Sequence, residues 1–300
     1  MNTRQERKAV ALSLFNAVAL LGDLNQVRAI VDEFGDDPEV MNAATATGET
    51  SLILAVLGGH TEVVNILLTA RELNRNATSQ AGAHTGLNAL MLAACYGKDK
   101  IVEMLAIDGR TTPNHANARG ETALILASIW CLPAVPVLTK MHNILPNLVD
   151  QHQHSALYFA IIRLSKFTPA DELPAHIAAL LAMPGIELET KNKKEWSPLM
   201  IAAGKGHLPT VRALLEAGAD PCYCLENGYT AAKIAYYAKH TNVMQLIETY
   251  AAEKRAPSET TLSTSQLGLF ATAAEALTAA TQPESSVNDA DNVAQKPGIW

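Results

Sequence analysis

One short pattern recurs along most of this chain. A Thr, Ser or Asn is followed by a small or apolar residue and then, in most copies, by Leu. The copies begin at Ser13, Thr50, Asn88, Thr122, Ser155, Ser197 and Thr230. Neighbouring copies start 33 to 42 residues apart. A period near 33 residues is the signature of stacked repeats, in which each unit buries its apolar face against its neighbours.

Each copy predicts two short helices separated by a turn. The Thr or Ser at the start caps the first helix, and small residues such as Ala93 let the first helices of neighbouring copies approach closely. In the stretch GETSLILAVLGGHTEVVNILL, residues 48–68, Gly59 then ends the first helix. The second helix carries apolar residues at helical spacing, such as Val63 and Leu67. The glycines therefore separate two helices instead of interrupting one.

This pattern resembles the ankyrin repeat, and the copy SPLMIAAGKGHLPTVRALLEAGADP at residues 197–221 resembles it most. The resemblance covers residues 10–252 and implies an all-α ankyrin-repeat solenoid. It would contain about seven helix-pair repeats, with β-turn fingers between them. The sequence departs from the family throughout in one position, because the histidine that follows Leu in the signature is replaced in every copy, and two copies depart further. The hydrogen bond that this histidine would make is therefore expected to be missing.

Two copies are irregular. In the copy that begins at Thr122, Cys131 stands in the place of the turn glycine, and Pro133 and Pro136 fall at the start of the second helix. Proline is tolerated there because the N–H groups of a first helical turn have no intrahelical partner. The copy that begins at Ser155 carries the extra segment SKFTPADELP between its helices. We expect this copy to bulge from the solenoid.

The composition changes after the repeats. Residues 253–282 are predicted to form a linker and a C-terminal helix, whose apolar face runs from Leu267 to Leu277. This helix either caps the last repeat, as arrays require for solubility, or docks a partner. Residues 283–300 are polar and acidic, and they are predicted to be disordered.

Charge and composition exclude several classes of function. The formal net charge is −7, and no extended cluster of Lys and Arg is present, so we expect no binding to nucleic acid. No apolar run reaches the roughly 18 residues of a membrane-spanning helix, so no membrane is expected. The four cysteines follow no repeated spacing, which favours a reducing compartment. The chain is expected to be monomeric on its own and cytoplasmic, or delivered into a host cytosol if it is a bacterial effector.

A signal peptide is the alternative for the N-terminal region. Its cleavage site would lie at Ala17–Ala19. Glu6, Ser13 and Asn16 interrupt the apolar segment that such a peptide requires. The repeat pattern also uses these residues as structure, so the secretory interpretation is the weaker one.

Chemical motifs are missing from the sequence. His152 and His154, like Cys222 and Cys224, do not form a complete zinc-ligand set, and no nucleotide-binding or nucleophile motif occurs. We therefore expect no cofactor, no metal and no enzymatic activity. The alternative is an enzyme whose site lies in the irregular repeat that begins at Ser155. Its candidate residues are Asp171, Glu172 and His176.

A stack of repeats offers an extended concave surface, formed by the fingers and the first helices. The family resemblance implies that contacts lie beside the finger glycine and at the two positions after the small residues. The candidates for partner binding at these positions are Tyr96, Arg119, Trp130, Arg163, Lys193, Lys194, Trp196 and Tyr229. Trp, Tyr and Arg are the residue types that dominate binding energy at interfaces. The sequence therefore predicts a non-enzymatic module that binds another protein, or alternatively an effector or inhibitor that blocks a target protein.

Overall fold

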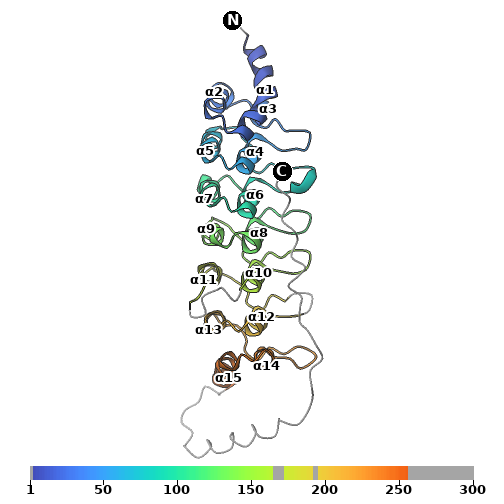
Figure 1. The fold of residues 1–300 in the computed structure, drawn as a ribbon, viewed down its shortest axis with the longest axis vertical. Coiled ribbons are helices and arrows are strands. Elements are labelled where there is room, and N and C mark those ends of the chain that lie inside the picture. Colours follow the sequence, from blue (N-terminus) through green and yellow to red (C-terminus); the bar gives the residue numbers. More distant parts are fainter. Residues whose placement is uncertain (1–2, 165–171, 192–194, 256–300) are drawn as a thin grey trace, which may run out of the picture.

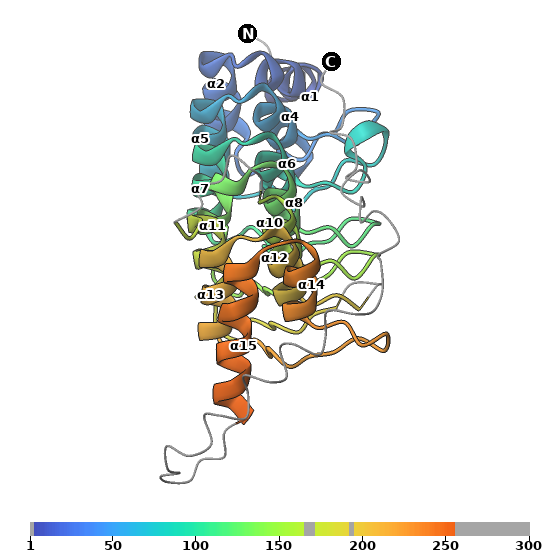
Figure 2. The same ribbon diagram turned by 60° about the horizontal axis from the view of Figure 1, so that its bottom comes forward.

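The computed structural model describes residues 3–164, 172–191 and 195–255. Within these ranges helices alternate with loops, and β-pairing is limited to isolated bridges between single residues. Seven helix pairs stack in single file (Figure 1). The first helices form one column, the second helices form another, and the loops between pairs project beside the first column (Figure 2). This arrangement confirms the predicted all-α solenoid.

The helices of the column beside the loops are called inner helices. They are α1 (Arg4–Leu21), α4 (Ser51–Gly58), α6 (Ala89–Tyr96), α8 (Ala123–Trp130), α10 (Ala156–Ile162), α12 (Pro198–Lys205) and α14 (Ala231–Tyr237). Each is followed by an outer helix. These are α2 (Leu24–Phe34), α5 (Thr61–Thr69), α7 (Asp99–Asp108), α9 (Val135–Leu138), α11 (Ala175–Leu181), α13 (Leu208–Glu216) and α15 (Thr241–Arg255). Short additional turns are α3 (Pro38–Met41), η1 (Gly82–His84) and η2 (Leu132–Ala134).

Polar side chains cap most inner helices, as the sequence predicts. The Oδ1 atom of Asn88 accepts from the Met91 N–H at 2.9 Å, and Thr122 Oγ1 accepts from the Ile125 N–H at 3.3 Å. The same capping bond is made by Ser155, Ser197 and Thr230. Thr50 is the exception, because its buried hydroxyl makes no capping bond. These bonds satisfy N–H groups that have no partner within the helix.

The first repeat begins earlier than the sequence pattern indicates. Its inner helix α1 starts at Arg4, and Ser13, which we expected near the start, lies in its interior. Thr3 caps the helix instead and forms a reciprocal capping box with Glu6. The extra turns of α1 project beyond the stack, where no preceding repeat is described (Figure 1). Val10 and Leu14 on this helix are accordingly exposed.

The turn glycines are needed for two physical reasons. Gly22 has a left-handed backbone, with φ of 77°. A Cβ atom on Gly22 would also lie only 2.6 Å from Nδ1 of His60, which belongs to the next repeat. The His60 ring lies there because its Nε2 atom is 2.8 Å from the Leu20 carbonyl oxygen. His240 covers Gly206 in the same way, so histidine over glycine joins neighbouring repeats.

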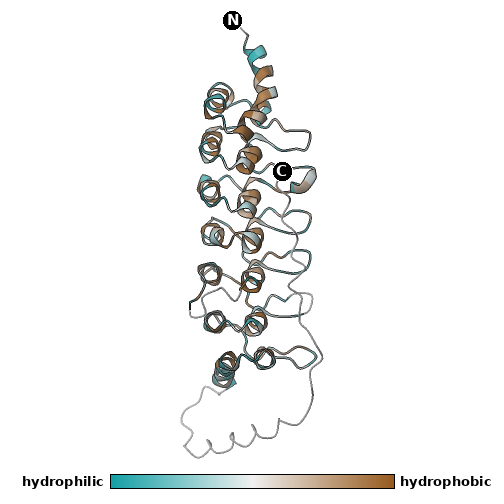
Figure 3. Cartoon of the chain, in the orientation of Figure 1, coloured by the Kyte–Doolittle hydropathy of each residue, from teal (hydrophilic) through white to brown (hydrophobic). Residues whose placement is uncertain are grey.

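The inner helices from α4 to α12 are buried on nearly all sides and the outer helices on one side, whereas the terminal inner helices α1 and α14 keep exposed faces. In α6 every residue from Ala89 to Cys95 is buried. Ala93 and Ala94 are fully buried at the close contact between neighbouring inner helices, as predicted. Apolar residues accordingly dominate the inner column (Figure 3). Burial of this surface is the main stabilising contribution in such a stack.

A ladder of asparagines links the loops that follow the outer helices. The Nδ2 atom of Asn42 donates to the Glu72 carbonyl at 2.8 Å, and its Oδ1 accepts from the Asn74 N–H at 2.6 Å. The same two bonds to the next repeat are made by Asn76, Asn114 and Asn147. Glu189 takes the following place and accepts from the Asp220 N–H at 2.7 Å. The sequence pattern alone did not reveal this ladder.

One buried ion pair joins the second and third repeats. The Arg75 Nε atom is 2.7 Å from Asp108 Oδ2, and both side chains are less than 10% exposed. The guanidinium also donates to the carbonyls of Leu68, Ala70 and Leu73, so its charge is well solvated by the protein. This cluster ties the end of α5 to the end of α7.

The irregular repeats have short outer helices. Outer helix α9 has four residues and follows the turn η2, so Pro133 and Pro136 lie at the starts of these elements as expected. Outer helix α11 starts after Pro174. The expected bulge at residues 165–171 lies outside the described residues. The predicted repeat region of residues 10–252 falls within the span from Arg4 to Arg255, and the C-terminal helix and tail, beyond residue 255, lie outside the described part.

Candidate functional site

The loops between repeats form stacked fingers. Five of them are closed by a single antiparallel bridge among the described residues, such as Ala116 with Thr122 and Val149 with Ser155. Backbone bonds also join neighbouring fingers, because the Gln151 N–H donates to the Arg119 carbonyl at 2.8 Å. The fingers therefore lie side by side along the inner column (Figure 2). The fingers and the inner helices are together called the finger face below, and this is the surface that the sequence predicts for binding.

Two fingers hold ordinary residues in a left-handed conformation. The tip position is glycine in four fingers, as in Gly120 with φ of 76°. Gln153 and Glu195 occupy the same tip position with φ of 65° and 62°. A left-handed conformation costs an L-residue roughly 1–2 kcal/mol, which glycine would avoid. Strain of this kind is concentrated at functional positions in proteins, and here it marks the fingers that precede α10 and α12.

Several of the predicted contact residues are exposed. Arg119 lies on a finger and Arg163 caps the end of α10, and neither side chain has a polar partner among the described residues. Tyr229 lies on the last described finger, is 41% exposed and has its ring 5.7 Å from that of Tyr237. Lys193 and Lys194, the remaining predicted finger residues, lie outside the described residues.

The other predicted residues have a structural role as well. Tyr96, Trp130 and Trp196 are half-buried and pack against the core. The Tyr96 hydroxyl is 3.0 Å from Nε2 of His84, which lies in the finger that contains η1. Burial raises the pKa of Tyr96. Tyr96 therefore links a finger to its inner helix, and truncation of any of the three residues would lower stability along with any binding.

A histidine cluster lies on the finger that precedes α10. The ring of His154 stacks on Tyr158 at 4.1 Å, and the rings of His152 and His154 are 5.8 Å apart. Asp150 is buried beneath them and accepts from the backbone N–H groups of both histidines at 2.8 Å. Burial alone would raise the pKa of Asp150, but the hydrogen bonds from His154 and His152 outweigh it and lower the pKa. The carboxylate shapes this finger, a role that the sequence did not reveal.

The described residues contain no group of three His, Cys, Asp or Glu side chains placed to hold a metal ion. Cys222 and Cys224 are free thiols. Among the candidate residues for the alternative enzyme site, Asp171 lies outside the described residues. His176 is described, and its burial lowers its pKa. Among the described helices, none is both long and apolar enough to cross a membrane.

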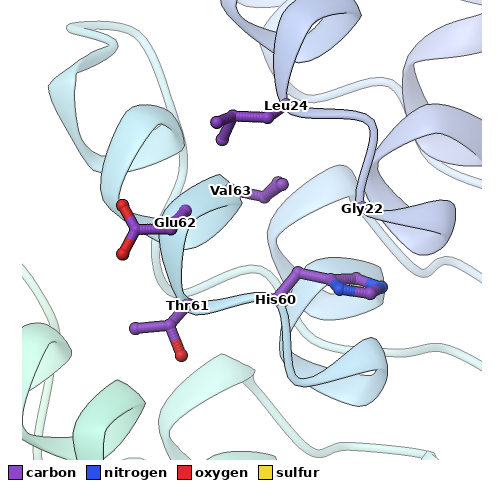
Figure 4. Close-up of a pocket in the computed structure, with 6 residues that line it drawn as sticks. All are labelled: Gly22, Leu24, His60, Thr61, Glu62 and Val63. Atoms are coloured by element: carbon purple, nitrogen blue, oxygen red, sulfur yellow. The ribbon is translucent and has the colours of Figure 1, made fainter.

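Two shallow hollows occur on the described surface, and both lie between N-terminal repeats. The first, of about 300 Å³, is lined by residues that include Gly22, His60 and Glu62 (Figure 4). The His60 ring and the Glu62 carboxylate point in different directions, so they form no catalytic pair (Figure 4). Neither hollow includes Glu172 or His176.

Known proteins share this sequence pattern and fold. Residues 14–115 and 171–257 match the family model described as ankyrin repeats. The chain is 28% identical over 239 residues to the ankyrin repeat protein nuc-2 of Neurospora crassa. This match covers 79% of this chain and 18% of that protein. It is 28% identical over 168 residues to the ANK repeat-containing protein nipk-1 of Caenorhabditis elegans, covering 54% of this chain and 25% of the relative.

A solved structure shows the same architecture. The ankyrin repeat domain of Bcl-3, described as a member of the IkappaB protein family, superposes with a TM-score of 0.62 at 23% identity. The match covers 77% of this chain and 97% of that domain. The curated relatives are much longer, since the chain spans only 18% of nuc-2 and 25% of nipk-1.

Proposed function

Because this chain belongs to the ankyrin-repeat family, we propose that it is a non-enzymatic module that binds another protein through its finger face. Ankyrin repeats are in general protein–protein interaction modules. The observation that carries the proposal is the pair of exposed arginines, Arg119 and Arg163, which have no side-chain partner in the described part of the chain. Arginine is enriched among the residues that dominate interface energies.

The geometry of the face favours rigid recognition. Backbone bonds join the fingers, and the Gln153 N–H donates to the Asp150 carbonyl at 3.0 Å, which fixes the strained tip of its finger. A pre-organised surface loses little conformational entropy on binding. An interface of standard size buries roughly 800 Å² on each partner, which would extend over three or four repeats.

The proposal is tested by reversing charges on the face without touching the core. In the finger-face variant, Arg119→Glu is combined with Arg163→Glu. In the control variant, Arg28→Glu and Arg212→Glu change two exposed arginines of outer helices. Each protein is immobilised, and the proteins that it captures from cell extract are quantified by mass spectrometry.

We expect specific proteins to be captured by the wild type and the control, and at least about tenfold less by the finger-face variant, since each exposed charge contact is reversed into a repulsion. Circular dichroism must show equal melting of the two variants. Equal capture by all three chains would discard the finger face as the binding surface.

A further inference from the structure

Three cations lie at the C-terminal ends of successive inner helices. Arg163 and Lys205 occupy equivalent positions, and Lys239 lies one position further on, at the left-handed turn position that Gly206 holds in the preceding repeat. Arg163 caps the end of α10, Lys205 is the last residue of α12, and Lys239 follows α14. All three side chains are exposed, and none makes a hydrogen bond or ion pair within the described residues. They are called the cationic row. Because α10, α12 and α14 are neighbours in the stack (Figure 1), the row crosses successive inner helices at the ends opposite the fingers.

The cationic row contrasts with the remainder of the protein. The chain as a whole has a formal net charge of −7. In these repeats the exposed acidic side chains of the finger face, Glu195 and Glu226, lie on fingers at the opposite end of the inner helices. An inner helix of eight residues separates the two ends by roughly 12 Å. Glu172 is an exposed acidic residue in the connection from α10 to α11, and none of the three cations makes an ion pair within the described residues.

A helix C-terminus by itself favours a cation, because the helix dipole is negative there. The helix dipole would raise the pKa of a cation, but burial lowers the pKa of Lys205. Lys205 also has no counter-ion among the described residues. A partly desolvated ammonium without a partner is destabilised, and a bound anion would relieve this. The inner helix that precedes the row ends with Trp130, at the position equivalent to Arg163 and Lys205. The row is thus continued by a half-buried aromatic side chain.

The spacing of the row matches an extended peptide. Packed helices lie roughly 8–10 Å apart, so equivalent positions on neighbouring inner helices, such as Arg163 and Lys205, are separated by about 10 Å. An extended chain rises about 3.3 Å per residue. Three residues of an extended peptide therefore span one repeat of the stack.

We propose that the cationic row binds an extended acidic segment of a partner protein. Carboxylates at every third residue face Arg163, Lys205 and Lys239, and an apolar side chain of the same segment contacts Trp130. The inference rests on the proposed function and adds the chemical class of the partner. A nucleic acid is the less suitable ligand, because three cations on a chain of net charge −7 offer few phosphate contacts.

The probe for this inference is a fluorescein-labelled peptide, FSSESSESSE, which places one Phe and three Glu residues at intervals of three. Fluorescence anisotropy measures its affinity for the full chain. Two comparison peptides are FEEESSSSSS, with the same composition, and FSSKSSKSSK. The row variant combines Arg163→Gln, Lys205→Gln and Lys239→Gln. The control variant combines Arg28→Gln, Lys100→Gln and Arg212→Gln, all exposed on outer helices.

We expect the wild type and the control variant to bind the regularly spaced acidic peptide about tenfold more tightly than the row variant does, since three ion pairs are lost. The comparison peptides should bind weakly, and raising the salt from about 0.1 M to about 1 M should weaken binding of the acidic peptide. Equal affinity of the row variant, or of the two acidic peptides, would overturn the proposal.

Two further measurements separate the alternatives. A single-stranded oligothymidylate that binds more tightly than the peptide would assign the row to nucleic acid. A peptide that binds only after removal of residues 283–300 would assign it to the acidic segment of the chain itself. Either result overturns the inference. If the peptide fails to bind while protein capture still depends on Arg119 and Arg163, the proposed function stands and only the inference about acidic segments falls.

Discussion

At the scale of single residues, the contacts that hold the repeats together are polar as well as apolar. The ion pair between Arg75 and Asp108 is buried, and its Nε and Oδ2 atoms lie 2.7 Å apart. A buried pair of this kind adds little over an apolar substitute, but the loss of one partner leaves an uncompensated charge. Asp108 also bonds to the exposed Arg110 through its other oxygen. Its removal therefore affects two guanidinium groups, of which only that of Arg75 is buried.

We predict that Asp108→Ala lowers the free energy of unfolding by about 3–5 kcal/mol, because Arg75 stays charged in a buried position. The matched control is Arg110→Ala, which removes a guanidinium that is 50% exposed and should cost less than about 1 kcal/mol. Urea denaturation followed by circular dichroism measures both values. Similar losses in the two variants would show that burial of the pair does not control its contribution.

At the scale of elements, the sequence predicted the helix pairs well and the contacts between neighbouring repeats poorly. The caps at Asn88 and Thr122 were predictable because the first turn of a helix needs local hydrogen bonds. Ser13 was misplaced because the capping box at Thr3 extends the helix through it. The bonds of Asn42 and the covering of Gly22 by His60 escaped prediction, since they join residues about 30 to 40 positions apart.

The candidate site was predicted to a similar degree. The sequence identified the finger positions, because the tip glycines and the repeat period fix where each finger lies. It could not show that Trp130 and Trp196 are half-buried while Arg119 and Arg163 are exposed without partners. That difference depends on the packing of neighbouring repeats. The cationic row likewise emerges only when α10, α12 and α14 are stacked.

The finger that contains Asp150 provides a prediction about pH. The pKa of this carboxyl is lowered in the folded state, so its charge contributes stability above the ordinary Asp value near 3.9, and this contribution is lost as the pH falls through the folded value. Asp150→Asn keeps an acceptor oxygen for the backbone N–H groups but removes the charge. At pH 5 to 6 we expect the wild type to be more stable by about 1–2 kcal/mol.

The difference should shrink toward zero as the pH is lowered to about 3 and below, because the wild-type carboxyl then takes up a proton. Thermal melts at closely spaced pH values measure it, and Glu226→Gln on another finger is the exposed control. A difference that stays constant from pH 6 to about 3 would mean that the charge of Asp150 does not stabilise the finger.

At the scale of the whole molecule, stability is a sum over repeats and the interfaces between them. The repeats differ in the number of residues that each buries. The pair α6 and α7 has long buried segments, whereas α9 has four residues and α11 has seven. The outer column is therefore weakest at its middle, beside the inner helix α10 that ends at Arg163. This places one cation of the binding face on a repeat that is held less firmly than its neighbours.

We predict that native-state hydrogen exchange, read by mass spectrometry in low urea, shows α9 and α11 opening before α6 and α8. Local opening follows local burial, because few apolar contacts resist it. Leu105→Ala in α7 and Leu180→Ala in α11 remove side chains that are both fully buried. Leu105→Ala should lower protection throughout the N-terminal repeats, and Leu180→Ala chiefly around α10 and α11. Uniform protection along the array would contradict this. Binding at Arg163 stabilises the folded form of its own repeat, so a bound partner should raise protection most where the free protein has least.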